Sequence, residues 1–104
     1  MGNNYRQGDV YILAASIPEK AAKAAPERDI VLALGEVTGH AHRIIAPGTK
    51  VSMWNVGTQR YMVVNEEVTL THEEHGPITI PPGEYEVRIQ RVYQPGGEIR
   101  QVAD

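Results

Sequence analysis

The chain has 104 residues, of which 41% are hydrophobic and 22% charged, and its formal net charge is -3. This length and balance predict one folded domain over residues 1–104, because so short a chain cannot build two cores. The acidic balance argues against nucleic acid as a partner, since phosphate backbones are bound by clustered basic surfaces, and the absence of cysteine excludes disulfides and thiolate metal ligands.

The first predicted strand, Asp9–Ala15, is rich in β-forming residues and follows a glycine. The next stretch, Ser16–Asp29, combines alanines with charged residues. Pro18 and Pro26 restrict the length of any helix there, so we expect an exposed loop with one short helical turn, either as a plain connection or as a lid or partner-binding loop.

From Ile30 onward, short β-rich runs alternate with turn signals. This pattern is typical of small antiparallel proteins, and we therefore predict an all-β fold, a small antiparallel β-barrel or sandwich. The predicted strands are 30–37 with a kink at Gly35, 42–46, 50–56, 59–64, 67–71, 77–80, 84–93 and an edge strand at 98–102. Turns are expected at 47–48, 57–58, 65–66, 81–83 and 95–97.

All four histidines fall in two compact stretches. The first, GEVTGHAHR (35–43), contains His40 and His42, which share one face if the segment is an extended strand. Glu36 and Thr38 have the same parity, so this face would also offer a carboxylate and a hydroxyl.

The second stretch, LTHEEHGPI (70–78), contains His72 and His75. Val68, Leu70 and His72 share parity, which would place His72 on the core-facing side of its strand. His75 stands before a turn, where it could complete a four-histidine set, bind a metal from the loop or orient the other histidines.

The histidine pattern predicts a site for one divalent metal ion, zinc first, with His40, His42, His72 and His75 as candidate ligands. Three histidines with an open fourth position let zinc make hydroxide at neutral pH. Two histidines with a carboxylate would instead suit iron. Glu36 or Glu73 could then accept a proton, and Thr38 could hydrogen-bond the hydroxide.

Three resemblances accompany these motifs. The strand-borne GHAHR and the later PPGEY turn together resemble the cupin superfamily over residues 35–93. This resemblance implies a small barrel with iron or manganese. His40 and His42 match the first-motif histidines of that superfamily, whereas His72 and His75 precede the turn. The chain also looks like small bacterial and phage proteins that share GEVTGHAHR and LTHEEHGPI. The histidine set is similar, in local geometry, to the zinc site of α-type carbonic anhydrases.

The sequence therefore favours a zinc enzyme that activates water for hydration or hydrolysis of a small-molecule substrate. The alternatives are an interaction module, homo-oligomeric through exposed strand edges, whose histidines stabilise the fold or an interface, and a metal-free site for acid–base catalysis or pH sensing. No apolar run reaches the roughly 20 residues that span a bilayer, and the first residues lack the pattern of a signal peptide, so we expect no membrane contact and a cytoplasmic location.

Overall fold

The computed structural model describes residues 3–35, 39–93 and 99–101, and the side chains among them up to Gln90. Every regular element in these residues is a β-strand, which confirms the predicted all-β class. Within the described residues there is no helix that could span a membrane.

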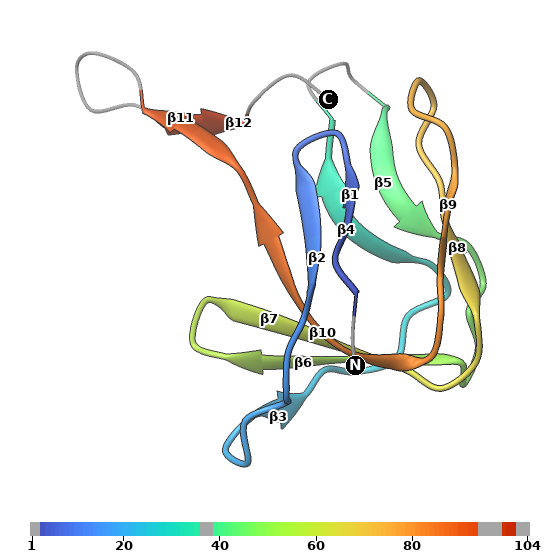
Figure 1. Cartoon of the computed structure of the whole chain (residues 1–104), viewed down its shortest axis with the longest axis vertical. Coiled ribbons are helices and arrows are strands. Elements are labelled where there is room, and N and C mark those ends of the chain that lie inside the picture. Colours follow the sequence, from blue (N-terminus) through green and yellow to red (C-terminus); the bar gives the residue numbers. More distant parts are fainter. Residues whose placement is uncertain (1–2, 36–38, 94–98, 102–104) are drawn as a thin grey trace.

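The largest element is a six-stranded antiparallel sheet in the order β1-β2-β10-β7-β6-β3 (Figure 1). Its strands are β1 (Tyr5–Gln7), β2 (Val10–Ala14), β10 (Gly83–Ile89), β7 (Gln59–Val64), β6 (Val51–Val56) and β3 (Ala22–Lys23). The β6–β7 hairpin forms as predicted, with Gly57 at a φ of 58° in the connecting turn. Such a positive φ suits glycine, which has no Cβ to clash with the backbone.

Three two-stranded ribbons complete the described part of the fold: β4 (Ile30–Leu34) with β5 (Ala41–Ile44), β8 (Val68–Leu70) with β9 (Ile78–Ile80), and β11 (Arg91–Tyr93) with β12 (Ile99–Gln101). Figure 1 shows β5 beside the β8–β9 ribbon, and contacts join β5 to β8 and β9 to β1. The strands thus pack as layers like a sandwich, and they do not close into a barrel.

The core lies between the large sheet and the β4–β5 and β8–β9 ribbons. It consists of aliphatic side chains with one methionine and one tyrosine, namely Val10, Ile12, Ile30, Leu32, Ala33, Ile44, Val51, Met62, Val64, Val68, Leu70, Ile80, Tyr85 and Val87. Alternation along the strands supplies these residues, because every second side chain of a strand points to the same face. The long predicted strand follows this rule, with Tyr85 and Val87 buried.

Two local predictions differ from the structure. The expected helical turn in 16–29 is absent: Ala21 donates its N–H to the Pro18 carbonyl in a tight turn, and the chain then pairs with β6 as the two-residue strand β3. Tertiary pairing with β6 outweighs the weak helix preference of this alanine-rich stretch. The predicted strand 84–93 is divided at Gln90, so that only its first part joins the large sheet.

Candidate metal centre

The two histidine stretches meet in space through a β-bridge between Arg43 and Thr71. The Arg43 N–H donates to the Thr71 carbonyl at 3.0 Å, and the Thr71 N–H donates to the Arg43 carbonyl at 2.9 Å. This pair of bonds extends β8 alongside β5. It therefore brings His72 and His75, which follow Thr71, next to His40 and His42, which precede Arg43.

The four imidazole rings form one cluster around His72. The centroid of the His72 ring lies 4.4 Å from that of His42, 4.8 Å from that of His75 and 5.6 Å from that of His40. The rings of His42 and His75 are 5.9 Å apart and nearly parallel, with an interplanar angle of 20°. All the histidines predicted as ligands thus come together at one place.

His42 belongs to the protein core, since its side chain is 0% exposed. Its Nδ1 lies 2.9 Å from Oε1 of Gln7, and the Nε2 of Gln7 donates to the carbonyls of Leu70 and Gly76, each at 3.0 Å. Because the amide nitrogen of Gln7 is used as a donor, its oxygen must be the acceptor for His42. Nδ1 of His42 therefore carries a proton.

The other ring nitrogen of His42 faces Asp9. Nε2 lies 3.2 Å from Oδ1 of Asp9, and both side chains are buried, at 0% and 1% exposed. With Nδ1 already protonated, this contact is attractive only if one further proton lies between the ring and the carboxyl group. His42 is thus held between Gln7 and Asp9 in the core, and both of its nitrogens face protein partners.

A different set of donors gathers nearer the surface. One ligand atom each of His40, His72 and Glu73 lies within 4.8 Å of the other two, and within the described ranges this is the set found that could hold a metal ion. His40 and His72 are partly buried, and Glu73 is exposed. The predicted ligands His40 and His72 are therefore in place, with Glu73 as a carboxylate beside them, whereas His42 and His75 are outside this group of donor atoms.

Glu73 is held in the group by the backbone of β5. Its Oε1 accepts the N–H of Ala41 at 2.9 Å, and its Oε2 lies 3.7 Å from Nη2 of Arg43. The hydrogen bond from Ala41 is the largest cause that holds the pKa of the Glu73 carboxyl below its usual range, followed by the N–H of Glu73 itself; Arg43 and His40 add smaller contributions, and burial opposes them. Glu73 is consequently a carboxylate at neutral pH.

The turn that follows β8 positions His72. Its Nδ1 accepts the backbone N–H of Glu74 at 3.0 Å and of His75 at 3.3 Å, so neutral His72 carries its proton on Nε2. A short segment with two donors aimed at one ring nitrogen fixes the plane of this imidazole. A metal ion bound at Nε2 would replace that proton.

Apart from the His42 ring, which faces Gln7 and Asp9, two solvent-shielded ring nitrogens have no hydrogen-bond partner among the residues that the structure describes, Nδ1 of His40 and Nε2 of His75. Nδ1 of His40 does lie 3.5 Å from Oε1 of Glu74, within reach of electrostatic attraction. Buried polar atoms are normally paired, and each exception calls for an explanation. A cation bound by His40, His72 and Glu73 would provide one for His40.

Sequence reasoning missed Gln7 and Asp9, which come from β1 and the turn before β2. The one available signal was a pair of polar residues just before the apolar run 10–14, and it does not indicate that their partner is His42, 35 residues after Gln7. The predicted catalytic residues Glu36 and Thr38 lie outside the described residues. The structure therefore does not test the roles predicted for these two residues.

The chain matches one known protein family. The family model "Domain of unknown function (DUF8820)" matches residues 6–90, and the chain belongs to this family. The matched range includes both histidine stretches as well as Gln7 and Asp9. Comparisons with curated proteins and with solved structures gave no match.

Proposed function

We propose that this member of the DUF8820 family binds one divalent metal ion, zinc first, through His40, His72 and Glu73, and uses it to activate water for hydration or hydrolysis of a small substrate. The observation that carries the proposal is the approach of the three donor atoms to within 4.8 Å of one another. Two imidazoles and one carboxylate, with a fourth position open to water, make up a common catalytic zinc set.

The three donor atoms lie within 4.8 Å of one another. Ligand atoms about 2.0–2.1 Å from a tetrahedral zinc stand about 3.3 Å apart, so binding would require the side chains to close by at most about 1.5 Å. Glu73 is exposed and His40 is only partly buried, which leaves them free to make this rotation. The negative charge of Glu73 would also offset part of the positive charge of the metal ion.

The protein surroundings would orient the ligands. Ala41 holds one oxygen of Glu73, and the turn 72–75 holds the His72 ring. Beneath them, His42 packs its ring 4.4 Å from that of His72 and is itself fixed by Gln7 and Asp9. We assign His42 a positioning role of this kind, because ligand orientation by neighbouring groups governs metal affinity.

Zinc would supply a bound water with a pKa of about 7, and thus hydroxide at neutral pH. The chain would then have to hold or move the released proton. Glu74, exposed and 3.5 Å from Nδ1 of His40, is one carboxylate for this task. Glu36 as a proton acceptor and Thr38 as a hydrogen-bond donor stay predictions from the sequence.

Iron or manganese is the alternative metal, because two histidines and a carboxylate are also the ligand set of non-haem iron enzymes. We expect zinc at this site of nitrogen and oxygen ligands, because zinc generally binds such ligands more tightly than iron(II) or manganese(II) does. The identity of a co-purifying metal decides between them.

A second function is favoured by one specific observation. His42 is 0% exposed and bridges Gln7 and Asp9, so at least one histidine stabilises the fold. This fits a non-catalytic interaction module, in which the histidine cluster holds β5 and β8 together. Such a module would bind no metal, or would bind one without an exchangeable water.

The test is the metal content, measured by elemental mass spectrometry, of untagged protein purified without added metal. We expect about one zinc per chain, and loss of most of it in Glu73→Gln. This variant keeps an oxygen to accept the Ala41 N–H and removes only the charge. Glu66→Gln, an exposed carboxylate outside the cluster, is the matched control and should keep its zinc.

Metal equally retained in Glu73→Gln and Glu66→Gln would remove the assigned ligand set. Absence of metal, even after incubation with zinc, would favour the non-catalytic module. Where zinc is present, assays of carbon dioxide hydration and ester hydrolysis follow, and no turnover in either would leave a structural metal as the better account.

A further inference from the structure

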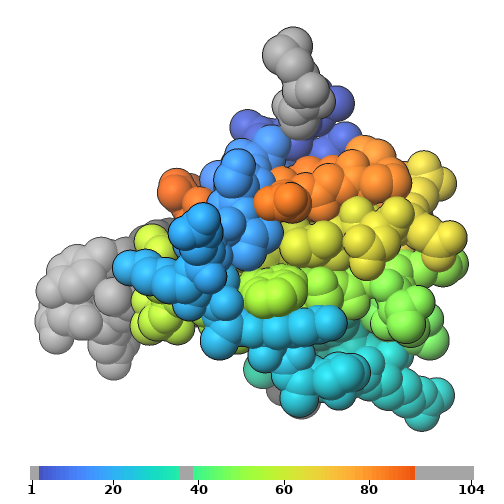
Figure 2. Space-filling model, turned by 90° about the horizontal axis from the view of Figure 1, so that it is seen from below, coloured from blue at the N-terminus to red at the C-terminus, as the bar shows by residue number. Residues whose placement is uncertain are grey.

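A cavity of about 380 Å³ lies at the β3 edge of the large sheet, and none of its lining residues belongs to the histidine cluster. The segment 24–27 forms one wall, and the Ala24 N–H ties this wall to β6 by a bond of 2.8 Å to the Met53 carbonyl. Figure 2 shows the segment in light blue beside the yellow-green of β6 and β7. The volume falls in the range of small-molecule sites, about 300–1,000 Å³.

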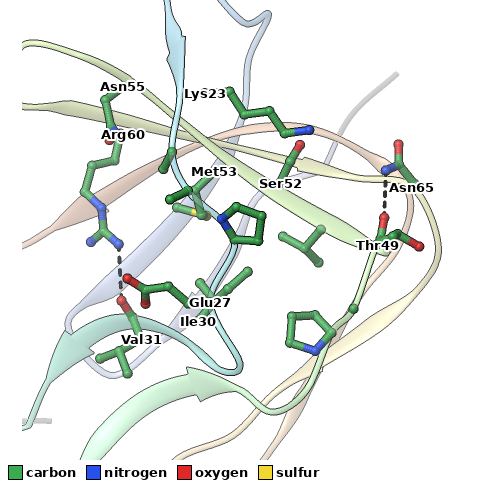
Figure 3. A pocket seen from close by; sticks show the side chains of 16 residues that line it. Lys23, Glu27, Ile30, Val31, Thr49, Ser52, Met53, Asn55, Arg60 and Asn65 are labelled. Atoms are coloured by element: carbon green, nitrogen blue, oxygen red, sulfur yellow. Dashed lines mark hydrogen bonds between the residues drawn. The ribbon is translucent and has the colours of Figure 1, made fainter.

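The floor of the cavity is apolar. Ile30 and Val51 are core residues that line it, and Met53 packs against the same core from its edge. Around this floor stand polar and charged side chains from the wall segment, β6 and β7 (Figure 3). Ligand sites combine apolar surface with convergent polar groups, and this cavity has both.

At one end of the cavity is the ammonium group of Lys23, which Figure 3 shows extending toward Ser52 and Asn65. No described carboxylate forms an ion pair with this ammonium group. The group lies 6.0 Å from the centroid of the Trp54 ring, and cation–π attraction to that ring holds it in place. The hydroxyl of Ser52 accepts the indole N–H of Trp54 at 2.9 Å, so its own proton is left to donate.

The other cation of the cavity, Arg60, is already engaged. Its guanidinium donates to the carbonyls of Leu32 at 2.6 Å and Val31 at 3.2 Å. Burial lowers the pKa of Arg60, and attraction to Glu27 opposes this effect. The charge of Arg60 is thus offset by the Glu27 carboxylate, and Lys23 is the lining cation that forms no ion pair with a described carboxylate.

We propose that this cavity binds a small organic anion with an apolar body, whose carboxylate lies between Lys23 and Ser52 and whose body lies against Ile30, Val51 and Met53. The cation and the hydroxyl donor both suit an acceptor-only head group. The apolar floor suits a short hydrocarbon chain, which would gain from leaving water. This inference is independent of the metal site.

The test uses hexanoate as the probe and follows backbone amide shifts of the ¹⁵N-labelled full chain. We expect saturable shifts, in the millimolar range, confined to segments 23–27 and 47–55. Hexylamine and hexan-1-ol are the matched probes, and we expect each to bind at least about tenfold more weakly, because a charged hydrogen bond of this kind contributes about that factor.

Lys23→Met keeps the apolar stem and removes the charge, and it should weaken hexanoate about tenfold. Lys20→Met, another exposed lysine that does not line the cavity, should bind hexanoate as the parent does. The amide spectrum of each variant reports whether it is folded. No saturable shifts, equal binding of hexanoate and hexylamine, or unchanged binding in Lys23→Met would overturn the proposal.

Discussion

Replacement of Asp9 by alanine would test the buried network most severely. The carboxyl group of Asp9 is 1% exposed and lies 3.2 Å from Nε2 of His42, which is 0% exposed. Truncation leaves a buried imidazole nitrogen without this partner, and an unsatisfied buried polar group costs about 1–3 kcal/mol, or more if it is charged. A domain of this size has a total stability of about 5–15 kcal/mol. Asp9→Ala should therefore lose a large part of it.

The conservative variant separates charge from hydrogen bonding. In Asp9→Asn, the amide can donate to the unprotonated Nε2 of His42, so we expect a smaller loss of about 1–2 kcal/mol. The assay is equilibrium unfolding in urea, followed by fluorescence of Trp54, the only tryptophan. Glu66→Ala, at an exposed position, should stay within about 0.5 kcal/mol of the parent.

A double-mutant cycle with His42→Ala measures the interaction itself. If the two side chains act as a pair, the cycle should give a coupling free energy of about 0.5–3 kcal/mol. Equal losses in Asp9→Ala and Asp9→Asn, or a loss in Asp9→Ala below about 1 kcal/mol, would show that the Asp9–His42 contact does not stabilise the fold. So would a coupling indistinguishable from zero.

Three further predictions follow from single contacts. The carboxyl pKa of Glu73, measured by NMR titration, should lie below its usual range, mainly because the carboxylate accepts the Ala41 N–H. Since the pKa is lower in the folded state, this contact stabilises the fold above the unfolded pKa, and its contribution is lost as pH falls through the folded pKa. A normal pKa for Glu73 would contradict this prediction. Arg60→Lys should destabilise the fold by about 1–2 kcal/mol in urea, because an ammonium group cannot make both guanidinium bonds to the carbonyls of β4; an unchanged midpoint would show that these bonds contribute nothing. Tyr85→Phe removes a bond of 2.7 Å from the buried hydroxyl to the Pro81 carbonyl and should cost about 1 kcal/mol, with the same assay as the check.

Local patterns predicted most of the strands, because alternation and turn residues act over a few positions. The β6–β7 hairpin shows this well: its two strands and the turn at Gly57 agree with the sequence prediction. The missed strands β1 and β3 have three and two residues, too few for an alternation to be visible. The lost helical turn reflects pairing with β6, a contact across about thirty residues that no local pattern contains.

The candidate site was predictable in its residue types but only partly in its geometry. Clustering in sequence identified His40 and His72, whereas their meeting depends on the bridge between Arg43 and Thr71, which is a long-range contact. One local signal could have placed His42 in the core: it shares strand parity with Ile44, which is buried. Its partner Asp9 lies in the turn before β2, far from His42 in the sequence, so only the three-dimensional structure identifies the pair.

The measurement that tests the metal centre most directly is the ring ¹⁵N spectrum of the four histidines before and after addition of one equivalent of zinc. We expect the ring nitrogens of His40 and His72 to shift strongly on zinc binding, and those of His42 to keep their positions because both already face Gln7 and Asp9. Strong shifts at His42 with none at His40, or no ring shifts at all, would contradict this expectation.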